Sequence, residues 1–255
     1  MSNTILHKAD TRGHANHGWL NSYQSFSFAG YYNPERTQFG VLRVLNDDVV
    51  TGGKGFGSHP HDNMEIISIP LEGSLVHEDN MGHKEVVSAG EIQVMSTGSG
   101  VFHSEYNNSA DKPAKFLQIW LFPNKLNVTP RYDQVKLDPK KGENRLQLLI
   151  APREGADIAG GESAGNGERE GTWIYQDAWF FSGRFDKERT LSYEKKKKEN
   201  GIYLFVIKGS FAVDGQRLET RDGLGVTDVD SIEIQSLGDD SEILIMDVPM
   251  KNKIQ

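Results

Sequence analysis

Short apolar and alternating runs recur along the whole chain, separated by glycine-rich or polar breaks. The clearest runs are FGVLRVLNDDVV, EIISIPLEGSLVHED, KEVVSAGEIQVMSTG, KFLQIWLFP, RLQLLIAP, TWIYQDAWFFSGRF, GIYLFVIKGSFAVDG and EILIMDVPM. Turn signals follow about every 8–12 residues, which is typical of an all-β sandwich or barrel, and long segments with helical period are missing. The pattern predicts an all-β protein.

A weak internal repeat indicates that the fold is built twice. The segment EIISIPLEGSLVHED…SAGEIQVMS has the same order of strands and glycine turns as GIYLFVIKGSFAVDG…RDGLGVTDVD. The matching turns are Gly73-Ser74 with Gly209-Ser210, and Gly90 with Gly223. The repeat predicts two β-barrels in tandem, with an N-terminal domain over residues 1–132 and a C-terminal domain over residues 133–255.

A glycine-rich polar stretch, EGADIAGGESAGNGEREG at 154–171, interrupts the second half. Its composition predicts an exposed loop, with a mobile lid over a pocket as the alternative. The basic run KKKK is flanked by glutamates and is predicted to be a solvated turn between strands.

Composition excludes several classes of function. The 255 residues carry a formal charge of −8, which disfavours direct nucleic-acid binding because such proteins use basic patches to neutralise phosphates. The absence of cysteine excludes disulfides, thiolate metal sites and a cysteine nucleophile. The N-terminus lacks a signal-peptide pattern and no apolar run is long enough to span a membrane. We therefore expect a cytoplasmic protein without a membrane partner.

All eight histidines lie in the first 103 residues, so a histidine-based site must belong to the first half. His59 and His61 occur in HPH, and His103 and Glu105 occur in HSE. On a strand, residues i and i+2 point to the same side, so each pair can face one point inside a barrel. An ungapped match of the repeat places Lys195, Lys197 and Ser236 at the positions of the three histidines, so no ligand set is expected in the second barrel.

The residue types in these two pairs predict a metal site. Three imidazoles and a carboxylate suit a first-row transition metal, whereas Ca²⁺ and Mg²⁺ prefer shells of oxygen alone. Four protein ligands on an octahedral ion leave two positions for water, O₂ or a substrate oxygen. Structural or incidental histidines are the alternative.

Other polar residues near these motifs are predicted to lie around the metal site or at the surface, and not to bind the metal. Glu65 and Asn63 share the strand parity of His59 and His61, and Glu65 is predicted to orient a histidine by a hydrogen bond rather than to bind the metal. The hairpin HEDNMGHKE is predicted to expose His77 and His83, and the segment RGHANHGW to place His14 and His17 at the surface or at a gate.

These residues resemble the first cupin motif, which Gly53, His59, His61 and Glu65 match. Within the cupins the chain resembles the pirin family, densely over residues 12–132 and loosely beyond. The resemblance is carried by WLNSYQSFSFAGYYNPERTQFGVLRVLNDD, HPHDNMEI, LEGSLVHEDNMG, AGEIQVMSTGSGVFHSEYN, LQIWLFPNKLNVTPRY and QDAWFFSG. The chain departs from the family where many pirins have HPHRGFE and HQDA, since it has Asp62, Asn63 and Tyr175.

The resemblance implies a bicupin with one metal ion in the N-terminal barrel, bound by His59, His61, His103 and Glu105, and a metal-free C-terminal barrel. The implied metal is iron, with Mn, Ni, Co, Cu and Zn as alternatives, because affinity order alone favours copper or zinc. The implied activity is that of a quercetin 2,3-dioxygenase, an oxidoreductase that takes a small aromatic substrate and O₂.

If this activity carries over, Glu105 is the candidate catalytic base for the 3-hydroxyl proton of a flavonol. Gln118 is a candidate polar group of the pocket. The candidate apolar walls are Phe56, Met64, Phe102 and Phe116, but a core position is the favoured interpretation because apolar residues on strands more often belong to the core. The second hypothesis is a metal- or redox-sensing regulatory protein that acts through a protein partner. The third is a metal-free β-barrel.

Overall fold

The computed structural model describes residues 2–153 and 170–254, so most of the glycine-rich stretch expected to be a loop or lid lies outside the described residues. The chain divides into two compact units. The N-terminal unit consists of Gly13–Leu137, Thr172–Gln176 and Asn252–Gln255, and the C-terminal unit of Met1–Arg12, Asp138–Gly171 and Asp177–Lys251.

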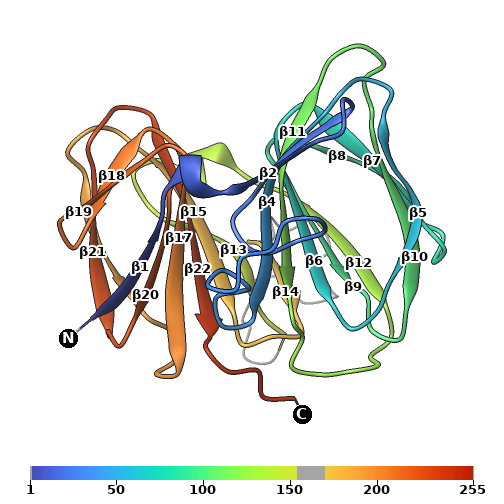
Figure 1. Ribbon diagram of the computed structural model, residues 1–255. Helices are drawn as coiled ribbons and strands as arrows, with labels where there is room; N and C mark the ends of the chain where they lie inside the picture. Colours follow the sequence, from blue (N-terminus) through green and yellow to red (C-terminus); the bar gives the residue numbers. More distant parts are fainter. Residues whose placement is uncertain (1, 154–169, 255) are drawn as a thin grey trace. The chain divides into compact units, whose positions relative to one another are not determined.

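The N-terminal unit is built from two antiparallel sheets (Figure 1). One has the strand order β12-β9-β6-β11-β4-β3-β2 and the other has the order β5-β10-β7-β8. The strands of this unit are β2 (Gly13–Asn16), β3 (Leu20–Gln24), β4 (Leu42–Val50), β5 (Gly55–His61), β6 (Glu65–Glu72), β7 (Ser74–Asp79), β8 (Lys84–Ser88), β9 (Glu91–Ser96), β10 (Val101–Asn107), β11 (Ala114–Leu121), β12 (Arg131–Lys136) and β14 (Thr172–Ile174).

The C-terminal unit repeats this plan. One sheet contains the order β1-β20-β17-β22-β15-β13 and the other has the order β16-β21-β18-β19. Its elements are β1 (Asn3–His7), η1 (Ala9–Thr11), η2 (Pro139–Gly142), β13 (Gln147–Pro152), β15 (Trp179–Phe185), β16 (Thr190–Glu194), β17 (Asn200–Lys208), β18 (Ser210–Val213), β19 (Gln216–Glu219), β20 (Gly223–Thr227), β21 (Ser231–Ser236) and β22 (Ser241–Pro249). The predicted all-β bicupin architecture is confirmed, and each long apolar run of the sequence corresponds to one or two of these strands.

The units differ from the predicted domains at their boundaries. Strand β1 pairs with β20, from Asn3 opposite Thr227 to His7 opposite Gly223. Residues 1–12 therefore lie in the C-terminal unit instead of the N-terminal domain expected at 1–132. Conversely, residues 133–137 and 172–176 lie in the N-terminal unit. The pairing of β1 joins positions more than 200 residues apart, and a local hydrophobic pattern carries no information about such a partner.

Buried apolar side chains form clusters in both units. In the C-terminal unit, one cluster joins both sheets, with Phe185 and Ile202 from one and Phe211 and Ile234 from the other. In the N-terminal unit, one cluster packs Leu75 on β7 against Phe116 on β11. Polar side chains from β4, β10 and β11 are also buried in the N-terminal unit.

The basic run lies between β16 and β17, as predicted, with Lys196, Lys197 and Lys198 exposed. Across the part of the chain that the structure describes, no helix is long and apolar enough to cross a membrane.

Candidate metal centre

Two neighbouring strands of the smaller sheet in the N-terminal unit carry the predicted ligands. Strand β10 pairs antiparallel with β5, and His103 lies opposite His59. The register shifts between His103 and Glu105, which is a bulge of the kind often found beside functional sites. Burial alternates along β10, so that His103 and Glu105 face the interior while Phe102 and Tyr106 face outward. The predicted shared face of the HSE pair is therefore present.

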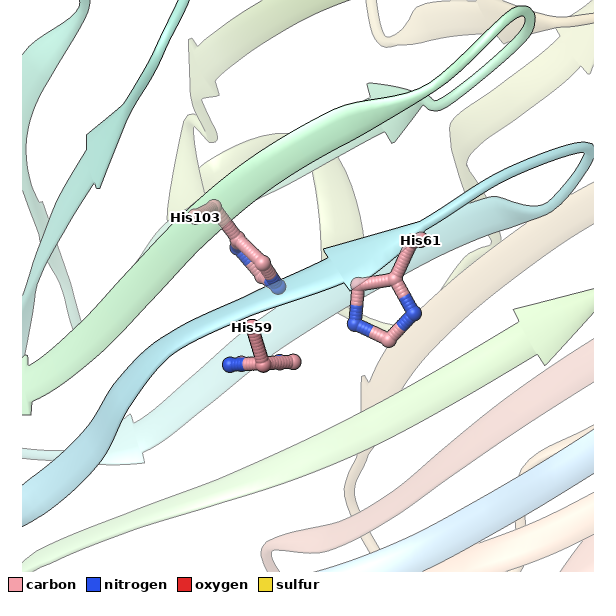
Figure 2. Close-up of side chains that lie close together, drawn as sticks. All are labelled: His59, His61 and His103. Carbon is pink, nitrogen blue, oxygen red and sulfur yellow. The ribbon is translucent and has the colours of Figure 1, made fainter.

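The three histidine rings converge from these two strands (Figure 2). Their ring centroids are 4.8 Å apart for His59 and His61, 4.5 Å for His59 and His103, and 5.0 Å for His61 and His103. One ring nitrogen from each lies within 4.8 Å of the others. The HPH motif thus brings two imidazoles to one place, and β10 adds a third.

The protonation states of His61 and His103 fit metal binding, which requires neutral imidazoles. Burial and the nearby His59 lower the pKa of His61 to about 4, and burial with the two other histidines lowers the pKa of His103 to about 3. Nδ1 of His59 lies 2.7 Å from the carbonyl oxygen of Gly57, to which it donates as N–H, and this tautomer leaves the Nε2 lone pair free.

His103 supplies the clearest test of fit. Its ring is buried, and neither Nδ1 nor Nε2 has a hydrogen-bond partner among the described residues. Buried side-chain nitrogens are rarely left unpaired in proteins, and an unpaired one invites a specific explanation. A divalent metal ion accounts for an unpaired, neutral imidazole better than a structural role does. The N-terminal unit therefore carries a donor set suited to a divalent metal ion.

Glu105 lies beside these histidines and is held by the opposite sheet. Its Oε1 accepts a hydrogen bond from Ser68 Oγ at 3.1 Å, and its Oε2 accepts one from Gln118 Nε2 at 3.0 Å. The carboxylate is buried, and burial raises its pKa above the usual range. A carboxylate oxygen of Glu105 and a ring nitrogen each of His103 and His77 also lie within 4.8 Å of one another.

The expectation that His77 is exposed is wrong. Its side chain is fully buried on β7, directly opposite Glu105 in the strand register. Nε2 of His77 lies 3.0 Å from Asp79 Oδ2, and Nδ1 lies 3.1 Å from Gln93 Nε2. The polar composition of the hairpin suggested solvent exposure, but β7 is an inner strand whose alternate residues face the interior. His83 is half-exposed and contacts the same Asp79.

Glu65, for which a histidine partner was predicted, and Asn63 have the following hydrogen-bond partners in the structure. Glu65 is buried on β6, and its carboxyl group accepts hydrogen bonds from Ser96 Oγ at 2.7 Å and from the main-chain N–H of Tyr175. Burial raises its pKa to about 8. Asn63 lies in the turn between β5 and β6, where its Oδ1 accepts from the main-chain N–H of Asn127 at 2.7 Å.

A cavity of about 730 Å³ opens beside the histidines and Glu105. Two of the candidate pocket residues, Gln118 and Phe56, line this cavity. His14 and His17 also line it, whereas Phe102 is 53% exposed on the outer face of β10. Residues that the sequence pattern did not single out also line it, and among these are Trp19, Phe28, Tyr31, Trp120, Ser22, Gln24, Asn46 and Asp48.

Aromatic rings form much of the cavity wall. The Trp120 ring lies 4.9 Å from His61 and 5.3 Å from Phe28 between centroids, and Trp19 lies 5.2 Å from Phe56. The signal for Trp120 was its even spacing from Gln118 on β11, which places both side chains on one face of the strand. The prediction of Gln118 as a pocket residue could therefore have been extended to Trp120, which the sequence analysis did not single out.

Comparisons with known proteins identify the family to which the chain belongs. A family model described as Pirin matches residues 6–121, and one described as Quercetinase C-terminal cupin domain matches residues 163–248. A quercetin 2,3-dioxygenase from Escherichia coli strain K12 is 41% identical over 244 residues, which are 96% of this chain and 98% of the relative. A pirin-like protein from Caulobacter vibrioides is 35% identical over 238 residues, which are 93% of this chain and 96% of the relative.

Among solved structures, the bacterial pirin YhhW from Escherichia coli in complex with nickel(II) superposes with a TM-score of 0.85. It is 38% identical in sequence, and the match covers 97% of this chain and 99% of that one. The similarity to YhhW therefore includes both units of the chain and is not limited to the histidine motifs. The chain belongs to the pirin family.

Proposed function

We propose that this protein is a metal-dependent dioxygenase of the pirin type, which opens the central ring of a flavonol with O₂ and releases carbon monoxide. The observation that carries the proposal is the convergence of three imidazoles beside a buried carboxylate and an aromatic-walled cavity of about 730 Å³. Cavities of about 300–1,000 Å³ are typical of small-molecule sites. The similarity to proteins named quercetin 2,3-dioxygenase supports the substrate class.

The proposed ligands are His59, His61, His103 and Glu105, with iron as the metal. Manganese, nickel, cobalt, copper and zinc are the alternatives, and the related pirin YhhW has been crystallised in complex with nickel(II). When bound, the ion supplies Lewis acidity toward the 3-hydroxyl and 4-carbonyl oxygens of a flavonol.

In this reaction Glu105 is the base that takes the 3-hydroxyl proton. Burial raises the pKa of its carboxyl group, and a general base works best when its pKa lies near the working pH. Ser68 and Gln118 hold the carboxylate on the cavity wall. The same group returns the proton to the carboxylate of the product.

The aromatic walls hold the planar substrate and exclude water. Trp120 packs beside His61, and Phe56 precedes His59 on the same strand. The bonds of carbon 3 to carbons 2 and 4 break in the reaction. Both atoms of O₂ end in the ester product, and carbon 3 leaves as carbon monoxide with its own oxygen.

The test is oxygen consumption with quercetin by the metal-loaded protein, beside carbon monoxide detection. Turnover is expected for the wild type, with a loss of more than about a hundredfold in His59→Ala and in Glu105→Gln. Glu72→Gln is the matched control, because Glu72 is an exposed carboxylate paired with Lys115 on the surface. Absence of turnover by protein with a full complement of metal would overturn the proposal.

The cavity favours catalysis over the regulatory hypothesis. A metal sensor that acts through a protein partner needs a bound ion and an exposed surface, but not a deep chamber beside the ion. A comparison of partner capture by metal-loaded and metal-free protein separates the two functions.

A further inference from the structure

One wall of the cavity is a patch of buried polar side chains from three adjacent strands. In the strand register, Ser22 on β3 lies opposite Asp48 on β4, and Gln24 on β3 lies opposite Asn46 on β4. On the other side of β4, Gln118 on β11 also lies opposite Asn46. All five line the cavity, and none is more than 8% exposed. Figure 1 shows β4 and β11 side by side in the N-terminal unit.

Three acceptor atoms in this patch have no hydrogen-bond partner among the described residues. They are Gln24 Oε1, Asn46 Oδ1 and Asp48 Oδ1. Buried polar atoms are almost always paired, so three neighbouring exceptions on one wall are unusual. Turning either amide by half a rotation exchanges its oxygen for a nitrogen, so each amide offers either an acceptor or a donor at this wall. The carboxyl group of Asp48 also has a hydrogen bond with Ser22, and burial raises its pKa to about 7.

A buried polar network in the C-terminal unit shows how buried acceptor atoms are usually paired within a protein. There, Asp247 is also buried, and its carboxylate accepts hydrogen bonds from Tyr193 Oη, Asn200 Nδ2 and the main-chain N–H of Lys196. The cavity wall differs because Gln24, Asn46 and Asp48 line the cavity while one acceptor atom of each has no partner among the described residues. Its partners therefore come from the contents of the cavity.

The chemistry of the wall restricts those contents. None of the described residues that line the cavity is lysine or arginine, so this wall itself offers no cationic side chain to an anionic group. Acceptors need donors, and a planar aromatic molecule with hydroxyl groups offers donors at its edge and faces that pack on Trp19, Phe28, Phe56 and Trp120. The buried indole Nε1–H of Trp120 also lacks a partner among the described residues and offers one donor in return.

We propose that Gln24, Asn46 and Asp48 form a hydroxyl-recognition wall, which binds phenolic hydroxyl groups of the substrate and determines which hydroxylation patterns the protein accepts. This inference rests on the proposed flavonol dioxygenase function. The 3-hydroxyl and 4-carbonyl groups are common to all flavonols, whereas the number of further hydroxyl groups differs among them. A site whose buried polar groups await hydroxyl donors discriminates strongly against analogues that lack them.

The test is anaerobic calorimetric titration of metal-loaded protein with four flavonols, which excludes turnover. They are 3-hydroxyflavone, galangin, kaempferol and quercetin, which carry the same 3-hydroxy-4-keto group and increasing numbers of other hydroxyls. We expect the wild type to bind quercetin at least about tenfold more tightly than 3-hydroxyflavone. In Asn46→Leu this preference falls about tenfold, because quercetin binds more weakly while 3-hydroxyflavone binds as tightly as before or more tightly.

Gln24→Met keeps the length of the side chain and provides the same measurement if Asn46→Leu does not fold. Gln134→Leu is the matched control, because Gln134 is an amide that bonds to Val86 and Glu91 outside the cavity. An unchanged preference in both wall variants, or an equal loss of affinity for all four flavonols, overturns the hydroxyl-recognition wall while leaving the dioxygenase function intact. Failure of the wild type to bind any flavonol overturns both.

Discussion

Ser96 Oγ donates a hydrogen bond to Glu65 Oε2 at 2.7 Å in the interior of the N-terminal unit, where β9 and β6 place the two residues directly opposite each other. The carboxyl group is fully buried, and burial raises its pKa to about 8 from a usual value near 4.5. Between these two pH values the unfolded chain ionises Glu65 while the folded protein keeps it protonated. Stability from this group is therefore present below about pH 4.5 and is lost as the pH rises through about 8.

This linkage predicts the behaviour of Glu65→Gln, which imitates the protonated carboxyl group at every pH. The variant should match the wild type near pH 4.5 and exceed its unfolding free energy by about 3–5 kcal/mol near pH 8.5. Urea unfolding of metal-free protein at the two pH values measures the difference, and metal-free protein is used because metal affinity itself depends on pH. Glu72→Gln should show no such trend, and a pH-independent difference for Glu65→Gln would contradict the assigned burial effect.

His103 should bind metal without being needed for the fold. Its ring nitrogens have no partners among the described residues, so replacement by alanine removes packing but leaves no other buried group unpaired. Addition of nickel(II) should raise the melting temperature of the wild type by mass action and leave that of His103→Ala unchanged. Thermal melting beside elemental analysis checks both statements. His83→Ala, which alters a half-exposed histidine outside the cluster, should retain the response.

His77 should stabilise the fold rather than bind the ion. Its Nε2 contacts Asp79, whose side chain is buried, and its Nδ1 contacts Gln93. His77→Phe keeps the ring volume but leaves the carboxylate without this partner, so we expect a loss of about 2–4 kcal/mol in unfolding free energy with the metal content unchanged. Elemental analysis decides the second part. A variant that folds but loses the metal would assign His77, with His103 and Glu105, to the ligand set.

Local patterns were sufficient to predict the strands and the histidine cluster. HPH and HSE each occupy alternate positions of one strand, and strand parity alone brings each pair to one face. The same parity was available for His77, which shares the face of Asp79 and lies opposite Glu105. The polar letters around it suggested a solvated hairpin, because composition does not reveal that a neighbouring strand covers the segment.

Long-range pairing explains the other differences. Strand β1 reaches β20, and the partners of Glu65 come from β9 and from Tyr175 far along the chain. The polar wall depends on β3, β4 and β11 being neighbours, which places Gln24 and Gln118 on either side of Asn46. The spacing of residues along the chain does not reveal any of these relationships. A single sequence therefore predicts which residues form strands better than it predicts which strands are neighbours.

The turn between β9 and β10 should be intolerant of any side chain at Gly98. This glycine has a φ of +45°, and a Cβ atom added to it would lie 2.0 Å from the carbonyl oxygen of Val128. Gly98→Ala must therefore displace the turn that leads into β10, and we expect a loss of more than about 2 kcal/mol in urea unfolding together with weaker metal binding. Gly82→Ala separates strain from collision, because Gly82 also has a positive φ, of +100°, but a Cβ there would meet nothing within 4 Å. Equal losses in the two variants would show that backbone conformation alone, and not the contact with Val128, determines the effect.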